Sequence, residues 1–139
     1  MTVITRYIEL TTSGNAESKN ITPELIEALE ETGFTNGVVT VFVPGATGGV
    51  TTVEFEPGLV RDLEDLWERI APSGKQYHHD DTWGDGNGYA HVRAALLGPS
   101  LTVPLIDGSL VLGTWQQIVL VDFDNRPRDR KILVHISGI

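Results

Sequence analysis

Hydrophobic and polar residues alternate with a period of two near both ends of the chain. The runs 2–10 and 131–139 place apolar and polar side chains on opposite sides, so both are predicted to be strands. Runs rich in β-branched residues at 36–45 and 49–55 predict two further strands, of which the first is expected to be buried. The polar segment 11–20 is expected to form a loop.

A period near 3.6 residues marks three predicted helices. The first has Thr22 as its expected N-cap and Pro23 as its first helical residue, and it ends at Gly33. The clearest helix lies at 58–72, and an alanine-rich third helix at 88–98 ends at a Gly-Pro pair. The apolar side of the clearest helix is formed by Leu59, Leu63, Leu66, Trp67 and Ile70.

The last third of the chain is predicted to be β-structure. Residues 100–113 form two short strands around Asp107-Gly108, a pair typical of a two-residue hairpin turn. A long strand at 114–124 and a turn at 125–130 lead to the final strand. Three antiparallel strands in series, after a mixed first half, favour an α+β fold over a parallel α/β sheet.

Composition limits the classes of function. A length of 139 residues corresponds to a single domain, and the absence of cysteine removes disulfides, thiolate metal sites and cysteine nucleophiles. The net charge of −9 disfavours general nucleic-acid binding, because phosphates are repelled. No signal peptide is recognised, and no apolar run approaches the ~20 residues of a membrane helix. We therefore expect a cytoplasmic protein that binds neither nucleic acid nor membrane.

One cluster of basic residues stands out against the acidic background. It consists of Arg126, Arg128, Arg130 and Lys131. Two interpretations stay open, a solvated hairpin turn and a contact for an anion. Arg128 and Arg130 would share one face of the final strand if that strand starts early.

The stretch 78–91 holds three of the four histidines together with Asp80, Asp81, Asp85 and Asn87. Three glycines in it predict a loop. Imidazole and carboxylate groups are ligands for zinc and similar ions, and they also form acid/base pairs near neutral pH. A metal site, an acid/base site and a merely solvated loop are therefore the three interpretations of this stretch.

Local geometry ranks the members of this stretch. His78 and His79 are adjacent and point to opposite sides of an extended segment, so only one of them is expected in a shared site. His91 begins the third predicted helix, across a glycine-rich loop that can fold back towards His79. Asp80 and Asp81 are expected to be solvated. The fourth histidine, His135, alternates with apolar neighbours and is expected to be structural.

The small-residue segment 44–49 precedes Glu54, which lies near the end of a predicted strand. Small residues allow a ligand to approach backbone N–H groups, but a plain hairpin loop is equally compatible with this composition.

The order of motifs in residues 77–138 resembles the YjbQ-type family, whose members are often described as secondary thiamin-phosphate synthases. The motifs are His79, the sequence Gly-Asn-Gly-Tyr-Ala-His ending at His91, Leu-Leu-Gly-Pro-Ser-Leu-Thr-Val-Pro at 96–104, Leu-Gly-Thr-Trp-Gln-Gln-Ile at 112–118, and Asp122-Phe-Asp. The N-terminal half matches this family more loosely, through the strand at 36–44 and the helix with Asp62 and Leu63.

The resemblance implies a single α+β domain over residues 1–139, mostly an antiparallel β-sandwich or barrel-like sheet with two to three helices. It also implies a homotrimer with sites near subunit boundaries, a divalent metal such as magnesium or zinc, and a phosphorylated metabolite as ligand. The activity attached to the family joins hydroxymethylpyrimidine pyrophosphate to thiazole phosphate and releases pyrophosphate. It is a weak, secondary activity.

Carried over to this sequence, the resemblance implies that His79, His91 and Asp85 are the catalytic and metal-binding residues. The substrate-binding positions that it implies are Glu54, Thr47, Asn87, Ser100, Gly113, Thr114, Trp115 and Gln116. Without the resemblance, a tryptophan at a strand start such as Trp115 is more typical of packing.

The sequence departs from the family pattern at three places. Gly45 stands where members usually carry a histidine, Val53 and Phe55 flank Glu54 where asparagines are usual, and Tyr89 replaces the first residue of a His-x-His pair. A non-catalytic trimer that binds a divalent metal or a phosphorylated metabolite is therefore the alternative to an enzyme.

Overall fold

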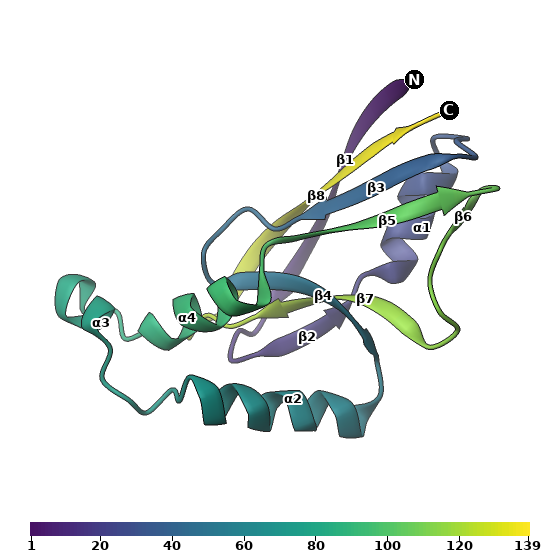
Figure 1. The fold of residues 1–139 in the computed structure, drawn as a ribbon. Helices are drawn as coiled ribbons and strands as arrows, with labels where there is room; N and C mark the ends of the chain where they lie inside the picture. Colours follow the sequence, from purple (N-terminus) through teal and green to yellow (C-terminus); the bar gives the residue numbers. More distant parts are fainter.

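Eight strands and four helices build the computed structural model, which describes residues 1–139 (Figure 1). In chain order they are β1 (Thr2–Thr12), β2 (Glu17–Asn20), α1 (Thr22–Glu30), β3 (Gly37–Phe42), β4 (Gly48–Glu54), α2 (Pro57–Ile70), α3 (His78–Trp83), α4 (Gly88–Leu97), β5 (Ser100–Ile106), β6 (Ser109–Leu110), β7 (Gln116–Asp122) and β8 (Arg128–Gly138). None of the helices is long and apolar enough to cross a membrane.

The strands form two antiparallel sheets, one of five strands in the order β1-β8-β3-β5-β6 and one of three in the order β2-β7-β4. Side chains along β7 alternate between the two faces of the three-stranded sheet, and both faces are covered, so this sheet is the middle layer. Ile118 and Leu120 face the five-stranded sheet and α1, whereas Val119 and Val121 pack with side chains of α2 and α4. The expected α+β class and its antiparallel sandwich are confirmed, with four helices in place of two to three.

The main core lies between the two sheets and α1. Ile21, Leu25 and Leu29 bring the apolar side of α1 against the inner residues of both sheets. Leu25 is fully buried, and burial of a leucine side chain contributes about 1.5–3 kcal/mol. This core fixes β7 and β8, the two strands that carry the buried charges described below.

A smaller core joins the middle sheet to the helices below it. The rings of Trp67 on α2 and Phe123 after β7 meet edge to face at a centroid distance of 4.9 Å. Close packing of the α4–β5 connection on β4 requires glycine at position 49, because a Cβ there would lie 2.7 Å from the carbonyl oxygen of Gly98. This close approach fixes the C-terminal end of α4, the helix that carries His91.

Two segments that the sequence predicts as loop are regular structure. Residues 17–20 form β2 and pair with β7, although their side chains are polar, because an edge strand is defined by backbone pairing rather than by burial. Residues 78–83 form the short helix α3. At its start the Asp80 carboxylate accepts a hydrogen bond from the Tyr77 amide, and at its end Gly84 adopts the left-handed conformation.

Two further expectations are wrong in detail. The strands β7 and β8 do not pair with each other, because the basic turn crosses from the middle sheet to the five-stranded sheet. Ile21, not Thr22, is the N-cap of α1, since the Thr22 hydroxyl instead accepts the amide of Ile118 at 2.7 Å. Asp107-Gly108 forms the expected hairpin turn, with positive φ at both residues.

Candidate functional site

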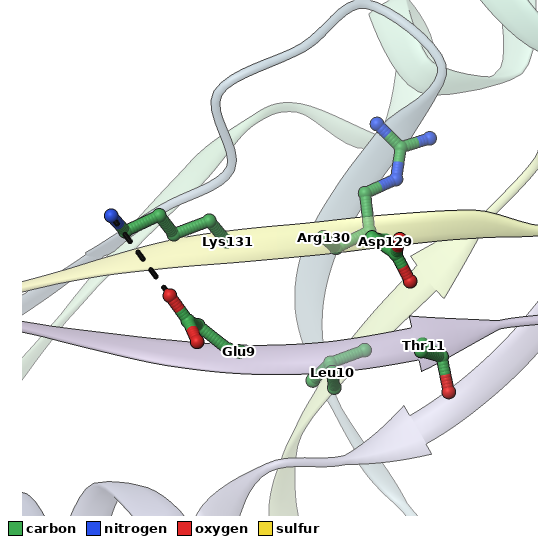
Figure 2. A pocket seen from close by; sticks show the side chains of 6 residues that line it. All are labelled: Glu9, Leu10, Thr11, Asp129, Arg130 and Lys131. Atoms are coloured by element: carbon green, nitrogen blue, oxygen red, sulfur yellow. Dashed lines mark ion pairs between the residues drawn. The ribbon is translucent and has the colours of Figure 1, made fainter.

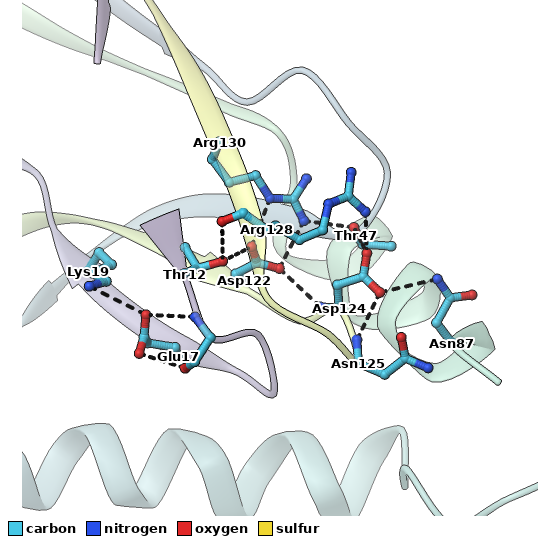
Figure 3. A network of polar contacts seen from close by, with 11 residues as sticks. Thr12, Glu17, Lys19, Thr47, Asn87, Asp122, Asp124, Asn125, Arg128 and Arg130 are labelled. Carbon is cyan, nitrogen blue, oxygen red and sulfur yellow. Dashed lines mark hydrogen bonds and ion pairs between the residues drawn. The ribbon is translucent and has the colours of Figure 1, made fainter. Parts of the chain in front are cut away.

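A buried ion pair joins the two sheets at the end of β7 (Figure 3). The Nε atom of Arg130 donates to Oδ2 of Asp122 at 2.8 Å, and its Nη2 atom donates to Oδ1 at 2.9 Å. Asp122 has no exposed surface and Arg130 is only 5% exposed. Thr12 on β1 donates a third hydrogen bond to the same carboxylate. A bidentate pair of this kind compensates two charges that would be very costly to bury alone.

A second buried carboxylate, Asp124, connects this pair to the region of the histidines. The Thr47 hydroxyl accepts from Nη2 of Arg130 at 2.8 Å and donates to Asp124 at 3.1 Å, so it bridges the two acids. The other donors to Asp124 are Nδ2 of Asn87 (3.3 Å), the amide of Asn125 (2.8 Å) and Nη1 of Arg128.

Both acids are charged at neutral pH despite their burial. Burial by itself raises the pKa of Asp122, but hydrogen bonds from Arg130 and Thr12 outweigh it, and the pKa lies below its ordinary value. For Asp124 burial likewise raises the pKa, and the Asn125 amide with Asn87, Thr47 and Arg128 lowers it further than burial raises it. The network therefore contains two carboxylates and two guanidinium groups, and its charges balance.

The two central members of the basic cluster are not simply solvated, because they pair with buried acids. The final strand starts early, at Arg128, and Arg128 and Arg130 share a face as expected. Asp122 holds Nε and Nη2 of Arg130, and Asp124 holds Nη1 of Arg128, whose side chain is 33% exposed. A neighbouring surface hollow of about 450 Å³ is lined by Arg130 and Lys131 among others, and Lys131 lies 3.9 Å from Glu9. In Figure 2 the Arg130 guanidinium points away from Glu9 and Leu10.

Two of the three histidines of the stretch 78–91, His79 and His91, meet where α3 and α4 face each other. The rings of His79 and His91 stack at a centroid distance of 4.3 Å with an angle of 37° between their planes. Nδ1 of His79 lies 3.7 Å from an oxygen of Asp85 and 3.9 Å from an oxygen of Asp80. This nitrogen is buried and has no hydrogen-bond partner.

The residues whose potential ligand atoms lie close together differ from the predicted set of metal ligands. Potential ligand atoms of His79, Asp80 and Asp85 all lie within 4.8 Å of one another, whereas His91 contributes a stacked ring. Asp80 is not solvated as expected, because its carboxylate accepts the amides of Tyr77 (3.2 Å) and Gly88 (3.1 Å). His78 and Asp81 are exposed.

The buried network reaches this group at two points. Asn87, which Asp124 holds, precedes the first residue of α4, so the network fixes the helix that presents His91. Nδ2 of Asn125 donates to the backbone carbonyl of Asp85 at 2.8 Å and anchors the loop that carries this acid. Oδ1 of Asn87 is buried and has no partner.

A cavity of about 210 Å³ lies beside His91 and the 45–48 loop. Gly45 lines it with a φ of +138°, and a Cβ there would begin 2.9 Å from Nη1 of Arg130. Because Arg130 is held by Asp122, it cannot easily move aside. Glycine at position 45 therefore fits both the positive φ and the position of the buried ion pair.

The remaining predicted substrate-binding residues lie apart from the histidines. Ser100 and Gln116 line a second cavity between β4 and β5, and Gln116 pairs with Glu54 across the β4–β7 ladder. The connection to β7 contains Thr114 and Trp115, both exposed, and Trp115 is 74% exposed. The packing interpretation of Trp115 is therefore wrong within this chain.

Sequence reasoning did not assign the Asp122–Arg130 pair to the site. A signal was present, since Asp122 interrupts a run of apolar residues in a strand that is otherwise buried. A charge at such a position requires a buried partner. Which of the nearby basic residues supplies it depends on the sheet crossing between β7 and β8, and the sequence does not show that crossing.

The family model described as "UPF0047 protein YjbQ-like" matches residues 6–139, so the chain belongs to this family. A UPF0047 protein of Methanothermobacter thermautotrophicus is 39% identical over 138 residues, which cover 99% of this chain and 94% of the relative. A UPF0047 protein of Bacillus subtilis is 32% identical and covers 96% of this chain and 98% of its own length.

Solved structures of family members share the fold. A YjbQ/UPF0047 family protein of Clostridium acetobutylicum superimposes with a TM-score of 0.86 at 34% identity, over 95% of this chain and 99% of that chain. A protein of unknown function from Sulfolobus solfataricus gives a TM-score of 0.88 at 28% identity, over 99% and 100% of the two chains.

The substitution Asp122→Asn is expected to lower the free energy of unfolding by about 3–5 kcal/mol, because it leaves Arg130 buried without a countercharge. Urea denaturation at neutral pH measures the change. The matched control is Asp129→Asn on the exposed side of β8, the strand that carries Arg130, which should change stability by less than about 0.5 kcal/mol.

The same pair sets a dependence on pH. Since folding lowers the pKa of Asp122 and Asp124, their stabilisation is complete above the unfolded pKa and is lost as the pH falls through the folded one. Stability should therefore decline below about pH 4, and the penalty of Asp122→Asn should shrink there. A penalty that stays constant into acid, or one no larger than that of Asp129→Asn, would contradict this account.

Proposed function

We propose that this YjbQ-like protein binds a divalent metal ion between α3 and α4 and uses it to hold a phosphorylated metabolite. The observation that carries the proposal is Nδ1 of His79, which is buried without a partner beside oxygens of Asp85 and Asp80. A buried polar atom without a partner costs free energy. A metal ion would be its partner in the bound state.

The chemistry of the three donors fits such an ion. One imidazole nitrogen and two carboxylate oxygens suit zinc or manganese better than magnesium, which prefers oxygen ligands alone. Three protein ligands also leave coordination positions for oxygens of a bound molecule. The backbone amides of Tyr77 and Gly88 donate to the Asp80 carboxylate and hold it in place, which reduces the entropy cost of binding.

Charge gives independent support for a role of the metal in holding phosphate. The net charge of the chain is −9, and the guanidinium groups of Arg128 and Arg130 are held by carboxylates. A phosphate in the cavity beside His91 would therefore meet arginines whose charge the buried acids already balance. When bound, a divalent ion would neutralise the charge on phosphate oxygens there. The 45–48 loop, built from small residues, lines the same cavity and lets a ligand come close to the backbone.

The family activity, thiamin-phosphate formation, is the second candidate function, and the position of His91 favours it. His91 lines the cavity and stacks on His79, so its ring is held beside the proposed metal site. In this reaction a nitrogen of the thiazole bonds to the methylene carbon of the pyrimidine while the bond from that carbon to the pyrophosphate oxygen breaks. The pyrophosphate leaves with the electron pair, and His91 would donate a proton to its departing oxygen.

For metal binding, we expect one zinc or manganese ion per chain in protein purified without a histidine tag. His79→Ala and Asp85→Asn should each weaken the affinity at least about tenfold, measured by isothermal titration calorimetry. His78→Ala is the matched control, because His78 is adjacent in sequence but exposed, and it should leave the affinity unchanged.

Failure of the metal proposal would be clear in the same experiment. Wild-type protein that binds neither ion stoichiometrically, or an effect of His78→Ala as large as that of His79→Ala, contradicts a site at these residues. Circular dichroism of each variant shows whether a loss of affinity comes from unfolding instead.

For the second candidate, His91→Phe should lower the rate of pyrophosphate release from the pyrimidine and thiazole substrates by about a hundredfold. Phenylalanine retains the stacked ring but removes the proton donor, so metal binding should persist. An unchanged rate contradicts the role of His91. Absence of turnover in wild-type protein with its metal bound contradicts catalysis altogether and favours a protein that only binds the metabolite.

We also propose that the chain associates as a homotrimer through the outward face of the five-stranded sheet. Apolar side chains on this sheet are unusually exposed, and they include Val3, Tyr7, Val38, Phe42 and Ile106 at 39–54% exposure. Across the same face His135 shares a hydrogen bond with Thr5 at 3.2 Å, which joins β8 to β1. Large exposed apolar patches mark sites of protein association.

Sedimentation velocity tests this assembly. The wild-type chain should sediment as a trimer, and Phe42→Glu should shift it towards monomer because a charge would be buried in the interface. Leu96→Glu is the control, since Leu96 is exposed on α4 instead. A wild-type monomer at micromolar concentration contradicts the proposal.

A further inference from the structure

A cavity of about 360 Å³ lies between the edges of β4 and β5, where the two sheets part. It adjoins the cavity beside His91, because Pro99 lines that one and Ser100 lines this one. Its volume falls in the range of small-molecule sites. None of the proposed metal ligands lines it.

No residue that lines this cavity carries a charge. The lining consists of Val50, Thr51, Thr52, Leu97, Ser100, Leu101, Thr102, Val103, Pro104, Val111, Leu112 and Gln116. Charged residues make up 21% of the chain, and other hollows of its surface contain several of them. The hollow between β1 and β8, for example, has Glu9, Asp129, Arg130 and Lys131 in its lining.

The polar groups of the cavity are hydroxyls and one amide. Four lining residues carry a hydroxyl, and each hydroxyl both donates and accepts hydrogen bonds. The amide of Gln116 is held in one orientation, since its Nε2 donates to the Thr52 hydroxyl at 2.9 Å and its Oε1 accepts the Gly113 amide at 3.0 Å. Gln116 therefore presents an ordered donor and acceptor rather than a mobile side chain.

Strand edges and apolar side chains form the rest of the wall. β4 pairs with β7 on one side only, and β6 covers β5 only at Leu105 and Ile106. Leucine and valine side chains of α4, β5 and the segment after β6 complete the lining. The cavity thus combines apolar surface with neutral hydrogen-bonding groups.

We propose that this cavity is a second binding site, specific for an uncharged small ligand that donates and accepts hydrogen bonds and has an apolar face. Free nucleobases and sugars share this chemistry. A charged ligand is disfavoured, because leaving bulk water for a cavity without a countercharge carries a desolvation cost. The inference goes beyond the proposed metal site and needs neither metal nor phosphate.

The experiment follows the amide spectrum of the ¹⁵N-labelled full-length chain during titration with uracil, with D-ribose and with orotate, all in the presence of EDTA. Orotate is uracil with an added carboxylate, so it isolates the effect of charge. Uracil or ribose should shift the side-chain amide of Gln116 and the backbone amides of β4 and β5 with saturation. Orotate should bind at least about tenfold more weakly than uracil. The response to uracil compared with ribose tells which class of neutral ligand the site prefers.

Two neighbouring glutamines give a matched pair of variants. Gln116→Leu should weaken binding of the preferred probe about tenfold, because it removes the ordered amide. Gln117→Leu should leave the affinity unchanged, because Gln117 points to the other side of the strand and accepts from Asn20. Thr52→Val, which removes the hydroxyl partner of Gln116, should act in the same direction as Gln116→Leu.

Three results would overturn the inference: saturation by neither neutral probe, orotate binding as tight as uracil binding, or equal effects of the two glutamine variants. Because EDTA is present throughout, binding of a neutral probe does not depend on the metal site. A failed metal titration and a failed probe titration are therefore separate outcomes.

Discussion

The buried pair between Asp122 and Arg130 is the constraint on which the rest of the candidate site depends. Two charges out of water must be matched by good geometry, and here a bidentate contact joins the middle sheet to the five-stranded sheet. The Thr47 hydroxyl bridges Arg130 and Asp124, and Asp124 in turn accepts a hydrogen bond from Asn87 at the start of α4. Charged and polar contacts in the protein interior therefore fix the start of α4, the helix that carries His91.

The same pair determines what chemistry is left for the surface. Because Arg128 and Arg130 neutralise buried acids, their charge is already balanced, and the pair between Asp122 and Arg130 also leaves little room for a side chain at Gly45. A chain of net charge −9 that binds a phosphorylated molecule then needs positive charge from another source. We propose that a divalent ion bound at Nδ1 of His79, beside two carboxylates, supplies this charge.

The sequence predicted most elements, because their patterns are local. The helix with Trp67 follows from its apolar period, and the Asp107-Gly108 turn follows from its dipeptide. The proximity of His79 and Asp85 was also predictable, since they are only six positions apart. What was not predictable depends on contacts distant in sequence. Asp80 is held by the amide of Gly88, which lies on the far side of a turn. Asp122 meets its partner only because the chain crosses from one sheet to the other between β7 and β8. Of the predicted substrate-binding residues, only Ser100 and Gln116 line the cavity between β4 and β5, and none lines the cavity beside His91, for the same reason.

The central claim is that the group formed by His79, Asp80 and Asp85 holds a divalent ion in the place that the buried network prepares. Anomalous diffraction from crystals grown with zinc, recorded on both sides of the zinc absorption edge, tests it most directly. The account predicts one strong peak within bonding distance of Nδ1 of His79 and of a carboxylate oxygen of Asp85. Well-ordered density for His79 with no peak beside it, or peaks only at other surface residues, would contradict the account.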